Sequence, residues 1–401
     1  MRLLFMLLLV STGIFAQKNY EFKNGNWYNG SGFTPGVWYT VGGVFSAKAP
    51  SRIDSVIDLN NYYVIPPLGD AYSASLAGNP LPESIIRSYL SEGVFYLQIL
   101  GNTKEQQEKL QPQLPSTFDV AYAQGEITGN MGTPYLKYEA DALGIAPGMI
   151  STKMAVLKDS RKSSGNGYWF VDSKETLTAN WPAIMARKPH AISIWMPDAE
   201  VSGGKEGKGL TPEMVKAVVK KAHKAKLKVY AHVETAADVR LAVNYGADAV
   251  VGLPGTEWDG KGDKSRYVLS DGDISKLVKK KTVIIPLAIK GYVVGDSVSR
   301  HILSTMNRLL TAGANLAIGS GDPQRTIRSE LNTWYMNRLN TQALLKILCQ
   351  RTPQAIFPNR KIGKIESGYE ASFLVVEHDP LTNLLRIRSS IMKVKKGELL
   401  K

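Results

Sequence analysis

The chain has 401 residues, and its 49 Lys and Arg against 35 Asp and Glu give a formal charge of +14 at pH 7. This length is enough for one large domain plus a smaller one. The single cysteine, Cys349, excludes a fold held together by internal disulfides, so the stability of the protein must come from its core.

Residues 1–16 have the pattern of a secretory signal peptide. Arg2 supplies the positive charge, an apolar run follows from Leu3 to Val10, and Ala16 precedes the expected cleavage site. The run is shorter than the ~20 apolar residues of a spanning helix, and no later stretch is long and apolar enough to cross a bilayer. We therefore expect an exported protein, periplasmic or secreted, without a transmembrane segment.

The next three regions are predicted from alternating patterns. Residues 17–62 contain short strand-like runs broken by turn signals such as Asn24-Gly25 and Gly42-Gly43. Residues 63–357 alternate apolar strands with amphipathic helices, which predicts an α/β (β/α)₈ TIM barrel. Its expected strands are 63–67, 94–99, 118–122, 191–195, 228–232, 249–252, 282–287 and 315–319. The interval 123–190 must hold a long loop as well as a helix.

Within the barrel region, the helix that starts near Thr211 is the best supported. Thr211 can cap it, Pro212 suits its first position, and an apolar stripe follows. Residues 358–401 return to β character, with strands expected at 371–377 and 391–396. Because each chain end alone is too small to bury a core, we expect both ends to build one small β-sandwich.

Lysines are concentrated between Lys216 and Lys228 and between Lys276 and Lys281. In an exported protein, this charge favours a small-molecule or anionic envelope ligand over nucleic acid. The alternative is that these lysines only form solvated helix faces. The oligomeric state is not predicted by any pattern in the sequence.

Two motifs of the chain have the pattern of a known family. Residues 64–71 read VIPPLGDA and resemble the end of the first barrel strand of the amidohydrolase superfamily, in particular its imidazolonepropionase- and prolidase-like branch, with Pro67 where a glycine is usual. Residues 362–376 read IGKIESGYEASFLVV and resemble the family's C-terminal return into the sandwich, with Ser372 in place of an aspartate. The resemblance covers nearly the whole mature chain. It implies hydrolysis at a metal held by imidazoles and carboxylates.

The same resemblance implies that the metal site is degenerate. The family's His-x-His pair falls at Tyr72 and Ala74, its bridging lysine at Ser193, and its sixth-strand histidine at Gly252. The histidine of the fifth strand is kept as His232, the candidate metal ligand. Its alternative role is that of a hydrogen-bonded histidine inside the barrel, since catalytic zinc usually takes ~3 protein ligands.

The eighth strand reads Gly319-Ser320-Gly321-Asp322, so the family's catalytic aspartate falls at Gly321 and Asp322 comes one residue late. A shift of one residue turns a strand side chain to the other face, although a loop at the strand's end can bring Asp322 inward. Asp322 is therefore the candidate catalytic residue. Asp70 is expected to order a loop, and Glu234 to act as a base or to stabilise the start of a helix.

Tyr72, Trp195 and Trp258 are candidate binding residues, with a plain core role as the alternative. We expect a catalytically impaired or non-catalytic exported protein that keeps a ligand pocket at the C-terminal barrel face and needs no cofactor. The competing hypothesis is an active hydrolase of C–N bonds, in dipeptides or non-peptide compounds, that uses one weakly bound zinc or other divalent metal.

Overall fold

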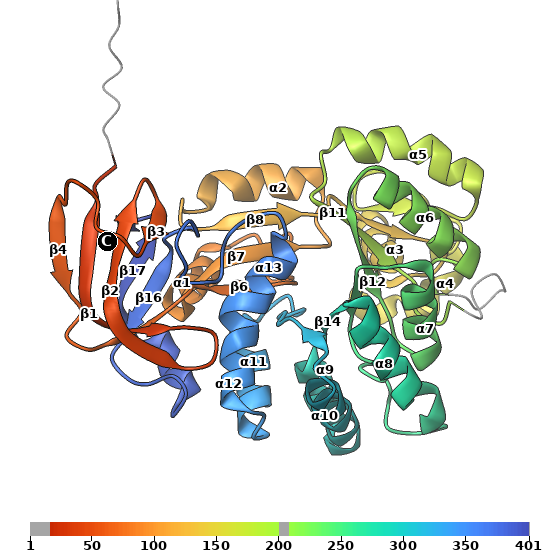
Figure 1. Ribbon diagram of the computed structural model, residues 1–401. Coiled ribbons are helices and arrows are strands. Elements are labelled where there is room, and N and C mark those ends of the chain that lie inside the picture. The colour runs from red at the N-terminus through yellow and green to blue at the C-terminus, as the bar shows by residue number, and fades with distance from the viewer. Residues whose placement is uncertain (1–16, 200–207, 401) are drawn as a thin grey trace, which may run out of the picture.

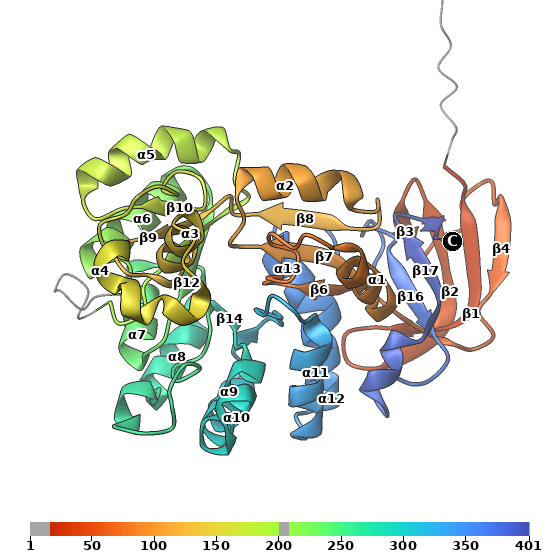
Figure 2. The same cartoon turned by 180° about the vertical axis from the view of Figure 1, so that it is seen from behind.

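The computed structural model describes residues 17–199 and 208–400, so the predicted signal peptide, residues 1–16, lies outside the described residues. Figures 1 and 2 show a β-sheet region at one end of the molecule and an α/β region that fills the rest. The red N-terminal strands and the blue C-terminal strands lie side by side in the β-sheet region in both views. Within the described part of the chain, no helix has both the length and the hydrophobicity needed to cross a membrane.

The β-sheet region contains strands from both ends of the chain. Its order is β18-β17-β16-β5-β1-β2-β3, with β4 also paired to β1. The strands are β1 (Tyr20–Tyr28), β2 (Phe33–Val41), β3 (Val44–Ser46), β4 (Ser55–Asp58), β5 (Tyr63–Ile65), β16 (Phe373–Val376), β17 (Ser390–Lys395) and β18 (Glu398–Leu399). Phe22 and Trp27 of β1 pack their rings against Phe373 of β16, at 4.9 and 5.6 Å between ring centroids. Strands from the two chain ends therefore share both a sheet and an aromatic core, as the sequence predicts.

The α/β region is built from parallel strands in two sheets. One has the order β6-β7-β8 and the other β10-β9-β11-β12-β13-β14-β15. Backbone hydrogen bonds from Ala71 N to Ile318 O and from His190 N to Tyr122 O, both 2.8 Å, link the two sheets. The strands are β6 (Leu68–Asp70), β7 (Val94–Ile99), β8 (Asp119–Tyr122), β9 (Glu126–Thr128), β10 (Tyr168–Phe170), β11 (Ala191–Trp195), β12 (Lys228–His232), β13 (Ala249–Val251), β14 (Val283–Ile285) and β15 (Asn315–Leu316). The arrangement is that of a TIM-barrel-like fold.

The helices lie around these parallel strands (Figure 1). The helix predicted after Thr211 is α6: the Thr211 side chain accepts a hydrogen bond from Met214 N, Pro212 occupies the first turn, and an apolar stripe is buried. The helices are α1 (Glu83–Glu92), α2 (Lys104–Leu110), α3 (Thr133–Ala142), α4 (Met154–Leu157), α5 (Lys174–Ala186), α6 (Pro212–Lys224), α7 (Ala236–Tyr245), α8 (Asp271–Lys280), α9 (Ala288–Val294), α10 (Asp296–Thr311), α11 (Ile327–Met336), α12 (Thr341–Lys346) and α13 (Thr352–Ile356).

Two expectations about the strands need correction. The barrel strand expected over 63–67 is wrong, because β5 (Tyr63–Ile65) pairs with β1 and β16 in the β-sheet region. The first parallel strand is β6 (Leu68–Asp70), and Pro66 and Pro67, which have no N–H to donate to a ladder, separate the two strands. The interval 123–190 holds not one helix but α3, α4 and α5 together with strands β9 and β10.

A cluster of four charged side chains joins the β-sheet region to the α/β region, and we call it the seam network. Lys395 Nζ lies 2.6 Å from Asp119 Oδ2 and 3.4 Å from Glu370 Oε1. Arg360 Nη2 lies 2.8 Å from Asp119 Oδ2 and 2.5 Å from Glu370 Oε2. Two carboxylates thus meet two cations at the start of β8, and Lys395 is only 6% exposed.

Candidate functional site

The candidate site is built where the parallel strands β9, β11 and β12 end. Register pairs Ser193 with Glu126 and Trp195 with both Thr128 and His232. Because side chains alternate along a strand, Ser193 and Trp195 point to the same face of β11. The register thus places Trp195 and His232 side by side at the ends of β11 and β12, with Glu126 of β9 and Ser193 of β11 paired two residues earlier.

A buried carboxylate and a buried imidazole are in contact at this point. Glu126 Oε1 lies 2.9 Å from His232 Nε2, and the two residues are 6% and 4% exposed. Ser193 Oγ also donates to Glu126 Oε1, at 3.2 Å. The His232 Nε2 contact is short but lacks the direction of a hydrogen bond, so this nitrogen has no geometrically good partner among the described residues. We call Glu126 and His232 the mouth pair.

Two aromatic rings cover His232. The indole of Trp195 stacks on its imidazole with ring centroids 4.5 Å apart and planes 27° apart. Tyr72 meets the same ring edge-on, at 5.3 Å and 74°. Burial, and next Glu126, hold the pKa of Tyr72 well above its usual value, so its phenol stays neutral. The structure thus gathers two of the three predicted binding aromatics around the predicted metal ligand.

Trp258, the third predicted aromatic, follows β13 and packs elsewhere. Its ring lies 5.6 Å from that of Tyr267 and 6.1 Å from that of His301. Its indole N–H donates to Lys261 O. No hydrogen bond or ring contact joins Trp258 to the mouth pair among the described residues, and its role in binding stays a prediction.

Asp70 anchors the end of β6 to the chain that follows β15. Its Oδ1 accepts from Tyr72 N and Ser320 N, both at 3.0 Å. Its Oδ2 accepts from Tyr89 Oη at 2.6 Å and Ser320 Oγ at 2.8 Å. Burial raises the pKa of this carboxyl, and the four hydrogen bonds oppose that rise. Because both oxygens are engaged, Asp70 orders the backbone around Tyr72, in the role expected for it.

Asp322 lies in a turn. Its Oδ1 accepts from Gln324 N at 2.8 Å, and its Oδ2 lies 3.8 Å from Arg325 Nε. Gly321 before it has a φ of +55°, and a Cβ at Gly321 would meet Leu287 Cδ2 at 2.6 Å. A side chain is therefore strained at the position that matches the family's aspartate. The catalytic role of Asp322 stays a prediction.

Glu234 lies just before α7, which begins at Ala236 and is capped by Thr235. Its Oε1 accepts from Glu257 N at 3.1 Å, and its Oε2 accepts from Thr256 Oγ1 at 3.2 Å. Burial, and next the charge of Glu257, raise the pKa of Glu234 to about 8. A carboxyl with such a pKa exchanges protons near neutral pH.

The donor groups at this end of the strands do not fit a zinc site with three protein ligands. In residues 17–199 and 208–400, no three His, Cys, Asp or Glu side chains are grouped so that they can hold a metal ion. Glu126 and His232 supply two donors, while Asp70 uses both of its oxygens in hydrogen bonds. Gly252, at the position of another family histidine, has a φ of +88°, which disfavours any side chain there.

A hollow of about 390 Å³ opens at the C-terminal side of the parallel strands, and neither residue of the mouth pair lines it. It is lined by the loops after β6 and β7, by α2, which contributes Glu105 and Lys109, and by α3, which contributes Tyr138. Burial, and next Glu126, raise the pKa of Tyr138, which places its phenol within the electrostatic reach of the mouth pair. None of the three predicted aromatics lines this hollow.

Glu126 is the site residue that reasoning from the sequence missed. The only signal was a charged residue at the start of the short segment Glu126-Ile127-Thr128, which is buried throughout. Buried carboxylates are rare unless paired, so such a residue marks a candidate partner for a histidine. The weak pattern in the interval 123–190 hid the strand that carries it.

Comparisons with known proteins support the fold. No family model matches the sequence, and no curated protein matches it. Among solved structures, an amidohydrolase is 17% identical with a TM-score of 0.72, over 96% of this chain and 99% of that one. A Xaa-Pro dipeptidase with bound methionine in its active site is 16% identical, with a TM-score of 0.71 over 96% and 100%. Ochratoxinase of A. niger is 14% identical, with a TM-score of 0.73 over 96% of each chain. The resemblance to the amidohydrolase superfamily is confirmed at the level of the fold.

Proposed function

We propose that this protein is an exported amidohydrolase-fold protein that is catalytically impaired or non-catalytic and binds a small molecule at the C-terminal face of its strands. The proposal includes closure of the parallel strands into one (β/α)₈ barrel and a periplasmic or secreted location. One observation carries it: His232, the one family histidine kept in the sequence, contacts the Glu126 carboxylate at 2.9 Å and is covered by Trp195 and Tyr72.

The chemistry of the neighbouring positions supports the same proposal. Ala74 and Gly252 have no donor atom in their side chains, and Ser193 already donates to Glu126. A hydrolytic metal centre needs an open coordination position in addition to its protein ligands. The mouth pair, closely packed by rings, offers neither the number of donors nor the open position.

The hollow of about 390 Å³ near Tyr138 supports a small-molecule ligand, because its volume lies in the usual range of ligand pockets, ~300–1,000 Å³. The solved Xaa-Pro dipeptidase holds methionine in its active site. We therefore take amino acids and short Xaa-Pro peptides as the first ligands to try.

The second candidate is a hydrolase of C–N bonds that works without a full metal site. The mouth pair favours it, since a carboxylate in contact with an imidazole is an arrangement in which enzymes position a histidine as a general base. Glu234, whose pKa is about 8, is a further proton acceptor at this end of the strands. The low exposure of His232, 4%, speaks against this candidate because an attacking water needs access to the base.

Metal content and hydrolysis together separate the two candidates. We expect purified protein to contain clearly less than one zinc per chain by elemental analysis, and to release no proline from Xaa-Pro dipeptides with or without added zinc. His232→Ala tests the mouth pair directly. His378→Ala, which removes an exposed histidine, is the matched control.

A full, tightly held equivalent of metal contradicts the proposal. So does hydrolysis that His232→Ala abolishes while His378→Ala leaves it intact, and this second result identifies His232 as part of a working active site.

A further inference from the structure

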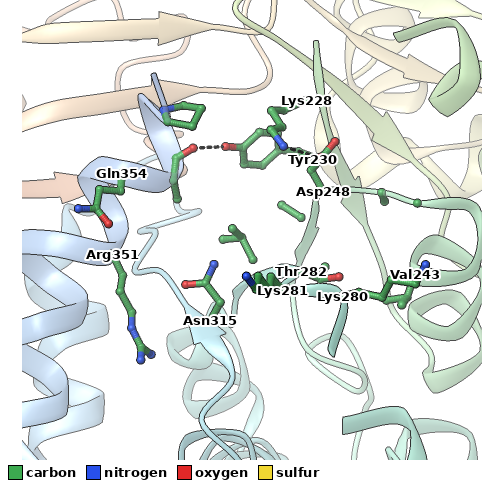
Figure 3. Close-up of a pocket in the computed structure, with 16 residues that line it drawn as sticks. Lys228, Tyr230, Val243, Asp248, Lys280, Lys281, Thr282, Asn315, Arg351 and Gln354 are labelled. Carbon is green, nitrogen blue, oxygen red and sulfur yellow. Dashed lines mark hydrogen bonds and ion pairs between the residues drawn. The ribbon is translucent and has the colours of Figure 1, made fainter. Parts of the chain in front are cut away.

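A second hollow lies at the opposite end of the parallel strands from His232. Lys228 begins β12 and lines the hollow, whereas His232 ends the same strand at the mouth pair. The hollow has a volume of about 370 Å³ and is also lined by Ala249, Val283 and Asn315, the first residues of β13, β14 and β15. Figure 3 shows side chains from these strands and from neighbouring helices arranged around the opening.

Cationic side chains dominate this hollow. Among the described residues that line it, Lys228, Lys280, Lys281 and Arg351 face one carboxylate, that of Asp248. They come from separate elements: Lys228 from β12, Lys280 and Lys281 from the end of α8, and Arg351 from the helical turn Ile347–Arg351. The charge is therefore spread around the opening and not confined to one helix face (Figure 3).

Asp248 is already engaged by groups of its own surroundings. Its Oδ1 accepts from Lys228 Nζ at 2.7 Å. Its Oδ2 lies 2.9 Å from His223 Nε2 and accepts from Val229 N at 2.9 Å. The carboxylate thus offsets the charge of Lys228, and it leaves Lys280, Lys281 and Arg351 as an excess of positive charge in the hollow.

The remaining cations have donors to spare. Arg351 donates from Nη1 to Ala314 O at 2.9 Å, which uses one of the five N–H donors of a guanidinium. Lys280 and Lys281 are exposed, and Lys281 closes α8 in a left-handed conformation with a φ of +55°. Thr282, Asn315 and Gln354 add neutral polar side chains to the lining.

A larger hollow of about 700 Å³ adjoins this one and shares Asn315, Arg351 and Gln354 with it. It adds Lys346 and Lys364, and Lys364 Nζ lies 3.2 Å from Glu366 Oε1. Positive charge thus continues along the surface away from the first hollow. A single-charge ion can contact only part of this set, whereas a molecule with several anionic groups can contact cations on more than one element.

We propose that the hollow at the starts of β12–β15 binds a small multivalent anion that carries two or more phosphate or carboxylate groups. This site is independent of the mouth pair, because it lies at the other end of the strands. It also gives a specific role to the lysines 228, 280 and 281, for which the sequence alone allowed either an anionic ligand or a solvated helix face.

Calorimetric titration with pyrophosphate and with citrate, at constant ionic strength, tests the proposal and separates phosphate from carboxylate chemistry. We expect saturable binding of at least one of these probes, and weaker binding of inorganic phosphate. Lys280→Gln combined with Lys281→Gln should weaken that binding at least tenfold. Arg351→Gln, made separately, should weaken it as well.

The matched control removes two exposed lysines outside the hollow, by Lys153→Gln combined with Lys158→Gln. It lowers the net charge equally and should leave binding within about twofold. Circular dichroism checks that each variant is folded. Equal weakening in both double variants would show a general charge effect and overturn the proposal. The absence of saturable binding of both probes by the folded wild-type protein would overturn it too.

Discussion

The seam network and the mouth pair are both buried clusters of charge, but they use their groups differently. In the seam network, two carboxylates face two cations, and Tyr96 and Ser372 donate further hydrogen bonds to Glu370. At the mouth pair, Glu126 meets one imidazole and one hydroxyl, and His232 Nε2 has no well-directed hydrogen bond among the described residues. The charges of the seam network balance, and its carboxylates are well hydrogen-bonded. At the mouth pair, His232 Nε2 can still form a hydrogen bond.

This difference separates a structural role from a functional one. A buried ion cluster with complete partners fixes two parts of a fold relative to each other, and the removal of one member leaves an uncompensated charge. A buried polar group without a good hydrogen-bond partner costs stability, so stability does not explain why such a group is present. We infer that the seam network holds the β-sheet region on the α/β region, whereas the incomplete bonding of the mouth pair supports the ligand-binding role proposed above.

The largest effect is expected from the seam network. Lys395→Met removes the buried ammonium between Asp119 and Glu370, and should lower the free energy of unfolding by about 3–5 kcal/mol. Denaturant titration measures this loss. The same change at the neighbouring exposed residue, Lys396→Met, should cost less than about 1 kcal/mol, because surface ion pairs contribute little. Similar losses for both variants would show that the buried position of Lys395 adds nothing, and would contradict the structural role of the seam network.

A smaller effect is expected at the mouth pair. Glu126→Ala leaves the buried Ser193 hydroxyl and the His232 imidazole without their carboxylate, and should cost about 1–3 kcal/mol in denaturant titration. Glu105→Ala, at an exposed carboxylate paired with Lys109, should change stability by no more than about 0.5 kcal/mol. A loss no larger than that of Glu105→Ala would show that the Glu126 carboxylate does not stabilise Ser193 and His232, and would contradict this prediction.

The smallest effect depends on pH. The pKa of Glu234 is raised to about 8 in the folded protein from 4.5, so the folded state binds its proton more tightly than the unfolded state. Its contribution therefore falls as pH rises from about 4.5 to about 8. Glu234→Gln should flatten this dependence, so the variant should gain stability relative to the wild-type protein as the pH rises from about 4.5 to about 8.

Thermal or denaturant unfolding across this pH range provides the measurement, and Glu398→Gln on an exposed edge strand is the control. A pH profile of Glu234→Gln that runs parallel to the wild-type profile would contradict the burial of an ionisable Glu234 carboxyl.

The sequence predicts a helix or strand well when the interactions that determine it lie close together along the chain. The α6 helix follows from its own residues, because Thr211 caps it and Pro212 sits in its first turn. The strands β11 and β12 have the predicted bounds, since each is a short and largely apolar run that can be recognised from its own residues. The β5 strand has the same apolar character as a barrel strand, so only tertiary pairing assigns it to the other sheet.

The candidate site was predicted in part for the same reason. The strand pattern places His232 and Trp195 at strand ends, and the structure brings them into contact. The partner of His232 is set by the pairing of β9 with β11, which no local pattern around Glu126 determines. The sequence alone does not decide whether Trp258 lines a pocket or packs in the core, because both roles favour a buried aromatic ring.

The place of β5 has a consequence for the order in which the sheet can be completed. On its two sides β5 pairs with β1, which is made before it, and with β16, which is made some three hundred residues later. During synthesis, one edge of β5 is therefore left unpaired until nearly the whole chain has emerged. Exposed strand edges recruit other strands, and long-range pairing is slow. A nascent chain that stalls before Phe373 exposes this edge of β5 to other chains. The pairing of β16 with β5 therefore also protects the protein against aggregation.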